Sequence, residues 1–467
     1  MDLEVAKQLI KKYETGHGAF MVRCDIAERY YRNETDILFK KSKKEDENGN
    51  PMRNADNRIP RNFHGLIVNQ KASYAFTTPP MFDVGNSGVN KRITEALGDE
   101  YEKNCKDLCV NAANTSIGWL HYWIDEDGVF QYAVVDSKEV IPIWSKDLKK
   151  KLLAVLRVYT DLDEATGDMY TYYEYWNDVE CQSFKRKTSD VEFDHFMYND
   201  MFVDPEGSEL VSEYFHDFGD VPFIPFHNNN ICTDDLQNIK PLIDVYDKVF
   251  SGFINDLDDI QQLIFILSGY GGEDLNGFLQ DLKKYKTIKI DGDEAGNGVS
   301  TLNIEIPIEA RNSVLEATRK AIFEQGQGFD PQPESFGNQS GEALKFMYSL
   351  LEMKTGLMET EFRLGFAKLV RAICKVYNIQ CGTIVQTWTR TRIKNDTELA
   401  QICKDSVGII STKTILKNHP FVEDVDAELK ELQKEKEEQK KEMEAQYDPF
   451  PNGDADPEGD QNIGGDE

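Results

Sequence analysis

Asp291, Asp293 and Gly296 stand at the spacing of a calcium-binding loop. Such a loop needs an oxygen ligand at its fifth position and a bidentate glutamate at its twelfth. Here Ala295 and Leu302 occupy those two positions. A hairpin turn therefore explains these acidic residues better than a calcium site.

Other residues with suggestive spacing also lack a required partner. Cys105 and Cys109 lie one helical turn apart, but no nearby histidine or second cysteine pair completes a four-ligand metal site. Gly269, Gly271 and Gly272 lack the Gly-Lys-Ser/Thr ending of a phosphate loop, and the seven histidines are scattered. We therefore expect buried structural thiols, no metal, no cofactor and no catalytic residues.

Composition restricts the classes of partner. The 467 residues are 40% hydrophobic and 11% aromatic, which is enough to build a packed core. The 83 acidic and 53 basic side chains give a formal charge of −30, which argues against a broad basic surface that grips nucleic acid. The eight dispersed cysteines and the lack of a run of about 20 apolar residues predict a soluble protein folded in a reducing compartment.

Hydrophobic periodicity divides the chain into helical and β regions. Helices are expected over the first thirty residues, 63–76 and 90–117, and a mostly antiparallel β region over 118–226. Further helices are expected over 236–268, 307–325, 341–377 and 394–447, with a strand over 383–393. The last residues, 448–467, contain no Lys or Arg and are expected to be disordered.

The segments 236–268 and 341–377 are predicted to be the two long helices. In the first, apolar residues, among them Val245 and Leu257, recur at three- or four-residue steps and are expected on its packed face. Opposite them lies a polar stripe expected to meet water or a neighbour: Asp247, Ser251, Asn255, Asp258, Asp259 and Gln262. Apolar residues of the second helix cover more than one face, which predicts burial among several neighbours, including other subunits.

Several short motifs occur in a characteristic order. They are Tyr30-Tyr31, Asn57-Arg58-Ile59-Pro60, Pro79-Pro80, the segments 220–226 and 239–247, Asn255-Asp256, the segment 340–345, and Ile410-Ser411-Thr412-Lys413-Thr414 before His419-Pro420. In this order and spacing the chain resembles the portal proteins of tailed bacteriophages, in the branch typical of phages of Gram-positive bacteria. The resemblance covers nearly the whole chain, although no single motif is specific.

The resemblance implies an α+β portal fold assembled as a ring, usually of twelve copies. It implies a wing (1–235, with the returning strand 383–393), stem helices (236–268 and 307–325), a small α/β clip (269–306), a tunnel loop (326–341), a long wing helix (342–377), crown helices (394–447) and the acidic tail. The ring would be the DNA channel at one capsid vertex. It would serve genome packaging, head-to-tail joining and DNA ejection.

The implied partners are the terminase large subunit, capsid and scaffold proteins, a head-to-tail adaptor and double-stranded DNA that passes non-specifically. The implied location is the virion, with the host cytoplasm during assembly and no membrane. The polar stripe of 236–268 would line the channel. Weak DNA contacts would come from the tunnel loop and the start of the next helix: Gln332, Asn338, Gln339, Ser340 and Lys345. Terminase or adaptor contact would come from clip lysines: Lys283, Lys284, Lys286 and Lys289.

Simpler explanations remain open for each feature. Any amphipathic helix shows the periodicity of 236–268, and the clip lysines also suit a solvated edge. For the acidic tail, a solubilising end is favoured over a docking peptide. The alternative functions are an acidic intracellular scaffold that binds proteins through its helices, and an enzyme acting through the Asp- and Tyr-rich β region.

Overall fold

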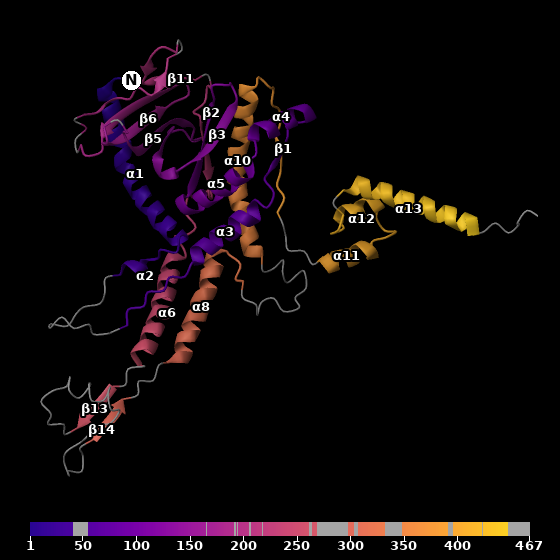
Figure 1. The fold of residues 1–467 in the computed structure, drawn as a ribbon. Helices are drawn as coiled ribbons and strands as arrows, with labels where there is room; N and C mark the ends of the chain where they lie inside the picture. Colours follow the sequence, from indigo (N-terminus) through magenta and orange to yellow (C-terminus); the bar gives the residue numbers. More distant parts are fainter. Residues whose placement is uncertain are drawn as a thin grey trace, which may run out of the picture. The chain divides into compact units, whose positions relative to one another are not determined.

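The computed structural model describes most of the chain in two compact units (Figure 1). The described residues are 1–40, 55–164, 166–190, 193, 195–204, 207–216, 218–260, 264–268, 298–302, 307–331, 348–390, 396–422 and 424–446. The first unit comprises those up to residue 390, and the second comprises those from 396 onward.

The first unit combines helices with antiparallel strands, as the sequence predicts. Its helices are α1 (Leu3–Tyr31), α2 (Asp36–Phe39), α3 (Phe63–Ala75), α4 (Ser87–Leu97), α5 (Tyr101–Thr115), α6 (Lys240–Ile260), α8 (Ile308–Gly326) and α10 (Ser349–Val376). Asp2 caps α1 by accepting a hydrogen bond from the Glu4 backbone N–H at 3.0 Å.

Two sheets form the β region between α5 and α6. One has the order β12-β2-β3, from Phe223–His227, Ile117–Ile124 and Phe130–Val135. The other has the order β11-β7-β6-β5-β4, from Glu213–Phe215, Glu180–Lys187, Met169–Trp176, Leu152–Leu162 and Val140–Trp144, with β8 (Met197–Tyr198) also on β7. Three smaller pairs complete the strands: β9 (Phe202–Val203) with β10 (Leu210–Val211), β1 (Met81–Asp83) with β15 (Val385–Thr387), and β13 (Ile264–Ser268) with β14 (Gly298–Leu302).

The largest hydrophobic core surrounds α10. Phe362, Phe366 and Leu369 are buried together with Phe76 of the α3 terminus and Phe226 of β12. A second core joins α1, α3, α6 and α8, and a third places the start of α1 on the larger sheet. The chain therefore buries several faces of α10 within one protomer. Leu357 of the same helix is 58% exposed, so its burial by a neighbouring subunit stays a prediction.

Three predicted boundaries are also corrected. The helix expected over 236–268 ends at Ile260, and Ile264–Ser268 forms a strand because its β-branched and aromatic residues favour pairing with Gly298–Leu302. The helix expected over 90–117 is interrupted at Gly98, whose φ of +65° suits glycine. Among the described residues, the second long helix begins at Ser349 rather than at 341.

Two long helices, α6 and α8, run side by side below the cores in Figure 1. Arg311 of α8 pairs with Asp256 of α6, and its guanidinium lies 5.5 Å from the ring centre of Phe253. Arg319 makes two hydrogen bonds to Asp330, of 2.9 and 2.6 Å. The first contact joins the start of α8 to the last turns of α6, and the second joins α8 to the chain that follows it.

The second unit is helical. It contains α11 (Asp396–Asp405), α12 (Thr412–Asn418) and the charged helix α13 (Val425–Gln446). Ser411 caps α12 by accepting from the Thr414 backbone N–H at 3.3 Å. No helix in the described ranges of either unit combines the length and apolarity needed to cross a membrane.

Gly365 of α10 provides a test of the main core. A Cβ atom at this position would lie 2.5–2.9 Å from three ring atoms of buried Phe226, whereas one at Gly356 of the same helix would meet nothing within 4 Å. We predict that Gly365→Ala lowers the free energy of unfolding by roughly 1–3 kcal/mol through overpacking. Gly356→Ala should raise it by up to about 1 kcal/mol through helix propensity. Urea unfolding of both variants checks the prediction, and an equal effect at the two glycines would refute it.

Candidate functional site

An extended segment, residues 55–61, lies along the polar face of α6. The backbone N–H of Arg61 donates to Asp247 Oδ1 at 3.1 Å, and that of Ile59 donates to Ser251 Oγ at 3.0 Å. The backbone N–H of Asn57 donates to Asn255 Oδ1 at 2.6 Å. Every second residue of the segment therefore bonds to every fourth residue of the helix.

The two backbones match in length. Two extended residues advance about 6.6 Å, and four helical residues advance about 6 Å. The side chains of α6 thus accept hydrogen bonds from alternate N–H groups as a neighbouring strand would. We call the three hydrogen bonds from residues 57, 59 and 61 to α6 the α6 ladder. At its far end, the Asn57 side chain also donates to Asp258 Oδ2 at 2.6 Å.

Asp247 is the most enclosed member of this ladder. Its side chain is 0% exposed and also accepts a hydrogen bond of 2.6 Å from Thr35 Oγ1. Burial raises the pKa of Asp247 to about 6, although the two hydrogen bonds partly offset that effect. The guanidinium of Arg61 lies 4.4 Å from the ring centre of Phe250 rather than in an ion pair with Asp247.

The predicted exposure of the α6 stripe is therefore corrected at two positions. Asp247 and Ser251 meet the chain's own segment 55–61 instead of water or a neighbouring subunit. Conversely, Val245 and Leu257, expected on the packed face, are 44% and 40% exposed. The reason is that α6 packs on α8 and on the segment 55–61 on two sides, which leaves a different strip of the helix open.

The other predicted site residues are only partly described. Asn255 is half-buried and Asp258 is exposed, so a channel-lining role for these two stays a prediction. The side chain of Asp259 and the remaining predicted residues lie outside the described part of the chain: Gln262, Lys283, Lys284, Lys286, Lys289, Gln332, Asn338, Gln339, Ser340 and Lys345.

The described residues on either side of 332–347 meet on α3. The rings of Phe329 and Tyr348 stack with their centres 4.8 Å apart and their planes at 8°. Gln70 of α3 donates to the Phe329 carbonyl at 2.7 Å and accepts from its N–H at 2.9 Å. Tyr74 of α3 stacks on Tyr348 at 6.0 Å. The chain thus enters and leaves 332–347 at adjacent points.

A buried charge cluster lies next to these anchors. The carboxylate of Asp235 is 3.1 Å from both Lys71 Nζ of α3 and Lys354 Nζ of α10. Lys354 also donates to the Gly326 carbonyl at the end of α8, at 2.8 Å. The two ammonium groups hold the pKa of Asp235 well below its usual range, whereas burial lowers the pKa of Lys354.

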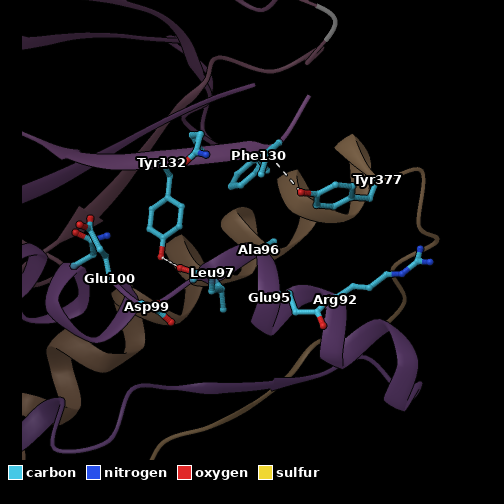
Figure 2. Close-up of a pocket in the computed structure, with 13 residues that line it drawn as sticks. Arg92, Glu95, Ala96, Leu97, Asp99, Glu100, Phe130, Tyr132 and Tyr377 are labelled. Atoms are coloured by element: carbon cyan, nitrogen blue, oxygen red, sulfur yellow. Dashed lines mark hydrogen bonds between the residues drawn. The ribbon is translucent and has the colours of Figure 1, made fainter. Parts of the chain in front are cut away.

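A separate pocket of about 620 Å³ lies between α4, β3 and the end of α10 (Figure 2). Tyr132 donates to the Leu97 carbonyl at 2.5 Å, and the Phe130 N–H donates to the Tyr377 hydroxyl at 3.3 Å. Both hydroxyls are therefore engaged in holding the walls together. The described residues contain no cluster of three metal-ligating side chains, and Cys105 and Cys109 are both buried.

No sequence pattern marks Gln70, Phe329 and Tyr348 as anchors, and none marks Asp235 as the centre of a charge cluster. Lys71 and Lys354 are isolated lysines in helical patterns, so nothing in the sequence distinguishes them from surface lysines. The motif Asn57-Arg58-Ile59-Pro60 was noted, but its pairing with α6 joins residues far apart in the chain. Only the tertiary contacts reveal these roles.

The raised pKa of Asp247 predicts a pH-dependent stability. An exposed aspartate has a pKa of about 4, so between about pH 4 and pH 6 the folded state binds more protons at this site than the unfolded state does. The contribution of Asp247 therefore falls as pH rises through this window, by up to about 3 kcal/mol. We predict that wild type loses stability relative to Asp247→Asn over the same window, measured by urea unfolding.

Ser251→Ala is the matched control for this measurement. It removes the next acceptor along α6 without changing an ionisable group, so it should cost about 1 kcal/mol at every pH. A difference between wild type and Asp247→Asn that stays constant from pH 4 to pH 7 would contradict the prediction.

Comparison with known proteins identifies the family. Residues 10–442 match the family described as "Phage portal protein, SPP1 Gp6-like". The portal protein of Clostridium phage phiCD119 is 44% identical over 429 residues, which cover 88% of this chain and 92% of that protein. The portal protein of Bacillus phage SPP1 is 30% identical over 423 residues, covering 87% and 82%.

Among solved structures, a chain of the virion of a native gene transfer agent particle has a TM-score of 0.45 at 11% identity and covers 75% of this chain and 88% of that chain. The family match and the two phage relatives confirm the resemblance predicted from the ordered motifs. This chain therefore belongs to the SPP1 Gp6-like family of phage portal proteins.

Proposed function

We propose that twelve copies of this portal protein form a ring at one capsid vertex and that double-stranded DNA passes through its centre. The ring serves genome packaging with the terminase large subunit, joins head to tail through an adaptor, and releases the DNA on ejection. Capsid and scaffold proteins are its partners during assembly in the host cytoplasm. In this proposal the energy comes from terminase, and the portal itself catalyses no reaction.

The observation that carries the proposal is the extent of the family match. It spans residues 10–442, and the two phage relatives are both named portal proteins. The match includes the β region, the α6 and α8 pair, α10 and nearly all of the second unit. An acidic scaffold that binds partners through helices alone would leave this continuous match unexplained.

The net charge of the chain suits a channel through which DNA passes better than a surface that binds DNA tightly. A net charge of −30 repels the phosphate backbone, so a moving duplex is not held. A head-to-tail ring uses two different faces of each subunit. The exposed strip of α6 at Val245, and Met353, Leu357 and Leu364 of α10, offer apolar surface for such contacts.

The anchoring of 332–347 supports its proposed role as a tunnel loop. The stack of Phe329 on Tyr348 and the clamp from Gln70 hold both ends of the segment at one place on α3. The Asp235 cluster secures the end of α8 beside them. In this proposal the rigid anchors keep the DNA-contacting residues in register around the ring.

Electron microscopy of the purified protein tests the assembly. We expect closed rings with a central channel, and the resemblance to portal proteins implies about twelve subunits. Analytical ultracentrifugation should give the matching mass in the same preparation. A strictly monomeric protein under every condition, including the presence of capsid components, would overturn the proposal.

Deletion of residues 333–340 tests the loop separately from the ring. Because Phe329 and Tyr348 remain, the anchors on α3 are kept. We expect intact rings by microscopy and reduced packaging or retention of DNA, measured as nuclease-protected DNA in assembled heads. A glycine and serine replacement of equal length keeps the chain connection and should show the same defect if the side chains act. Loss of rings on deletion would make the segment structural.

A further inference from the structure

A basic pocket of about 590 Å³ lies on the first unit, away from the α6 ladder. The turn after β4, the chain after β12 and the middle of α10 form its walls. Lys149 and Lys150 come from the turn, and Lys368 and Arg371 come from α10. Glu361 is the single acidic residue among its lining residues.

The four cations of the pocket are exposed to solvent. Lys149, Lys150, Lys368 and Arg371 are exposed, and none makes an ion pair with a described residue. By contrast, many other described lysines and arginines pair with acids, as expected in a chain of net charge −30. The pocket therefore carries four exposed cations that no described carboxylate neutralises through an ion pair.

One titratable group in the pocket, His227, responds to the positive charges beside it. The pKa of His227 is lowered by burial and further by repulsion from Lys368 and Lys150. Burial also lowers the pKa of Lys368, although Asp220 partly opposes this effect. A bound carboxylate would relieve both costs, because it favours the protonated form of each group.

Part of the remaining lining is apolar. Trp144 and Pro225 line the pocket, and Leu364 on its rim is 62% exposed. The rings of Trp144 and His227 lie 6.3 Å apart. A ligand that fits must therefore combine several carboxylates with an apolar or aromatic side chain.

The C-terminal end of this chain has that chemistry. Residues 448–467 contain seven acidic side chains and no lysine or arginine, and Tyr447 and Phe450 provide aromatic groups at their start. Each copy of the chain carries one pocket and one such end. We propose that the basic pocket binds the C-terminal segment 447–467 of a second copy of this chain.

This interaction goes beyond the proposed function and does not depend on passage of DNA. Duplex DNA offers phosphates in long rows on a broad surface, whereas this site is a compact hollow with an apolar wall. An acidic peptide with one aromatic anchor uses both features. If the C-terminal segment of each copy binds the pocket of the next copy, every subunit boundary of an assembly gains one more contact.

Peptide binding tests the proposal directly. The protein is prepared without residues 447–467, so that its own ends do not compete, and is titrated against a fluorescent synthetic peptide of that sequence. We expect a saturable rise in anisotropy that disappears at about 1 M salt, where the screening length is about 3 Å. Lys149→Glu with Lys150→Glu should weaken binding by about tenfold or more.

Lys11→Glu with Lys12→Glu is the matched control. It changes the net charge equally on two exposed lysines of α1, and it should bind like the parent protein. Peptides with Phe450→Ala, or with every acid replaced by its amide, should bind more weakly. No binding by the parent, or equal weakening by both lysine pairs, would overturn the proposal.

A disulfide test in the full chain identifies which copy donates the segment. Cys232 lines the pocket and is exposed, and Asn452→Cys places a thiol next to Phe450. Oxidised glutathione should then produce covalent dimers and larger ladders on a non-reducing gel. Cys232→Ser in the same chain should remove them. A cross-link that remains within one chain, or ladders that survive Cys232→Ser, would overturn the assignment to a second copy.

Discussion

The contact on which most of this architecture depends is the buried carboxylate of Asp235 between two lysines. Removing an ionised carboxylate from water costs many kcal/mol unless other charges and donors replace the lost hydration. Lys71 and Lys354 supply the charges, and Asn228 donates a further hydrogen bond of 2.9 Å. Because each partner comes from a different part of the chain, α3, α10 and the segment before α6 are held together.

The same cluster explains how the two halves of the first unit meet. The backbone N–H of Asp235 donates to the Ala113 carbonyl of α5 at 2.8 Å, directly before the chain enters α6. Lys354 reaches the last turn of α8 through the Gly326 carbonyl. The sheets and α10 therefore connect to the α6 and α8 pair through a polar joint. Its geometry is specific because a missing partner leaves a charge buried and unpaired.

The α6 ladder also joins distant segments of the chain, but through hydrogen bonds from backbone N–H groups rather than through ion pairs. A helix normally satisfies its own backbone, so its side chains are free to accept from another segment. Asp247, Ser251 and Asn255 serve as acceptors for residues 57–61, which form no sheet. The polar stripe of α6 therefore holds a piece of the chain in place. Where that segment covers the helix, its own residues form the outer surface.

Local pattern was enough to determine much of this protein. Helical periodicity predicted α3 and α8 closely, alternation predicted the β region, and the order of short motifs identified the family. These features depend on neighbouring residues, whose chemistry acts through the period of a helix or strand. The excess of acidic over basic side chains, which argues against a tight DNA clamp, also follows from composition alone.

Only the tertiary structure decided which surfaces are covered. The amphipathic pattern of α6 is the same whether its polar face meets water or the segment 55–61, and nothing local distinguishes Lys71 and Lys354 from exposed lysines. The buried face of α10 packs on Phe76 and Phe226 of the same chain, whereas Leu357 of that helix is exposed. Burial is a property of contacts between distant segments. Periodicity shows that a face has a partner without showing which one.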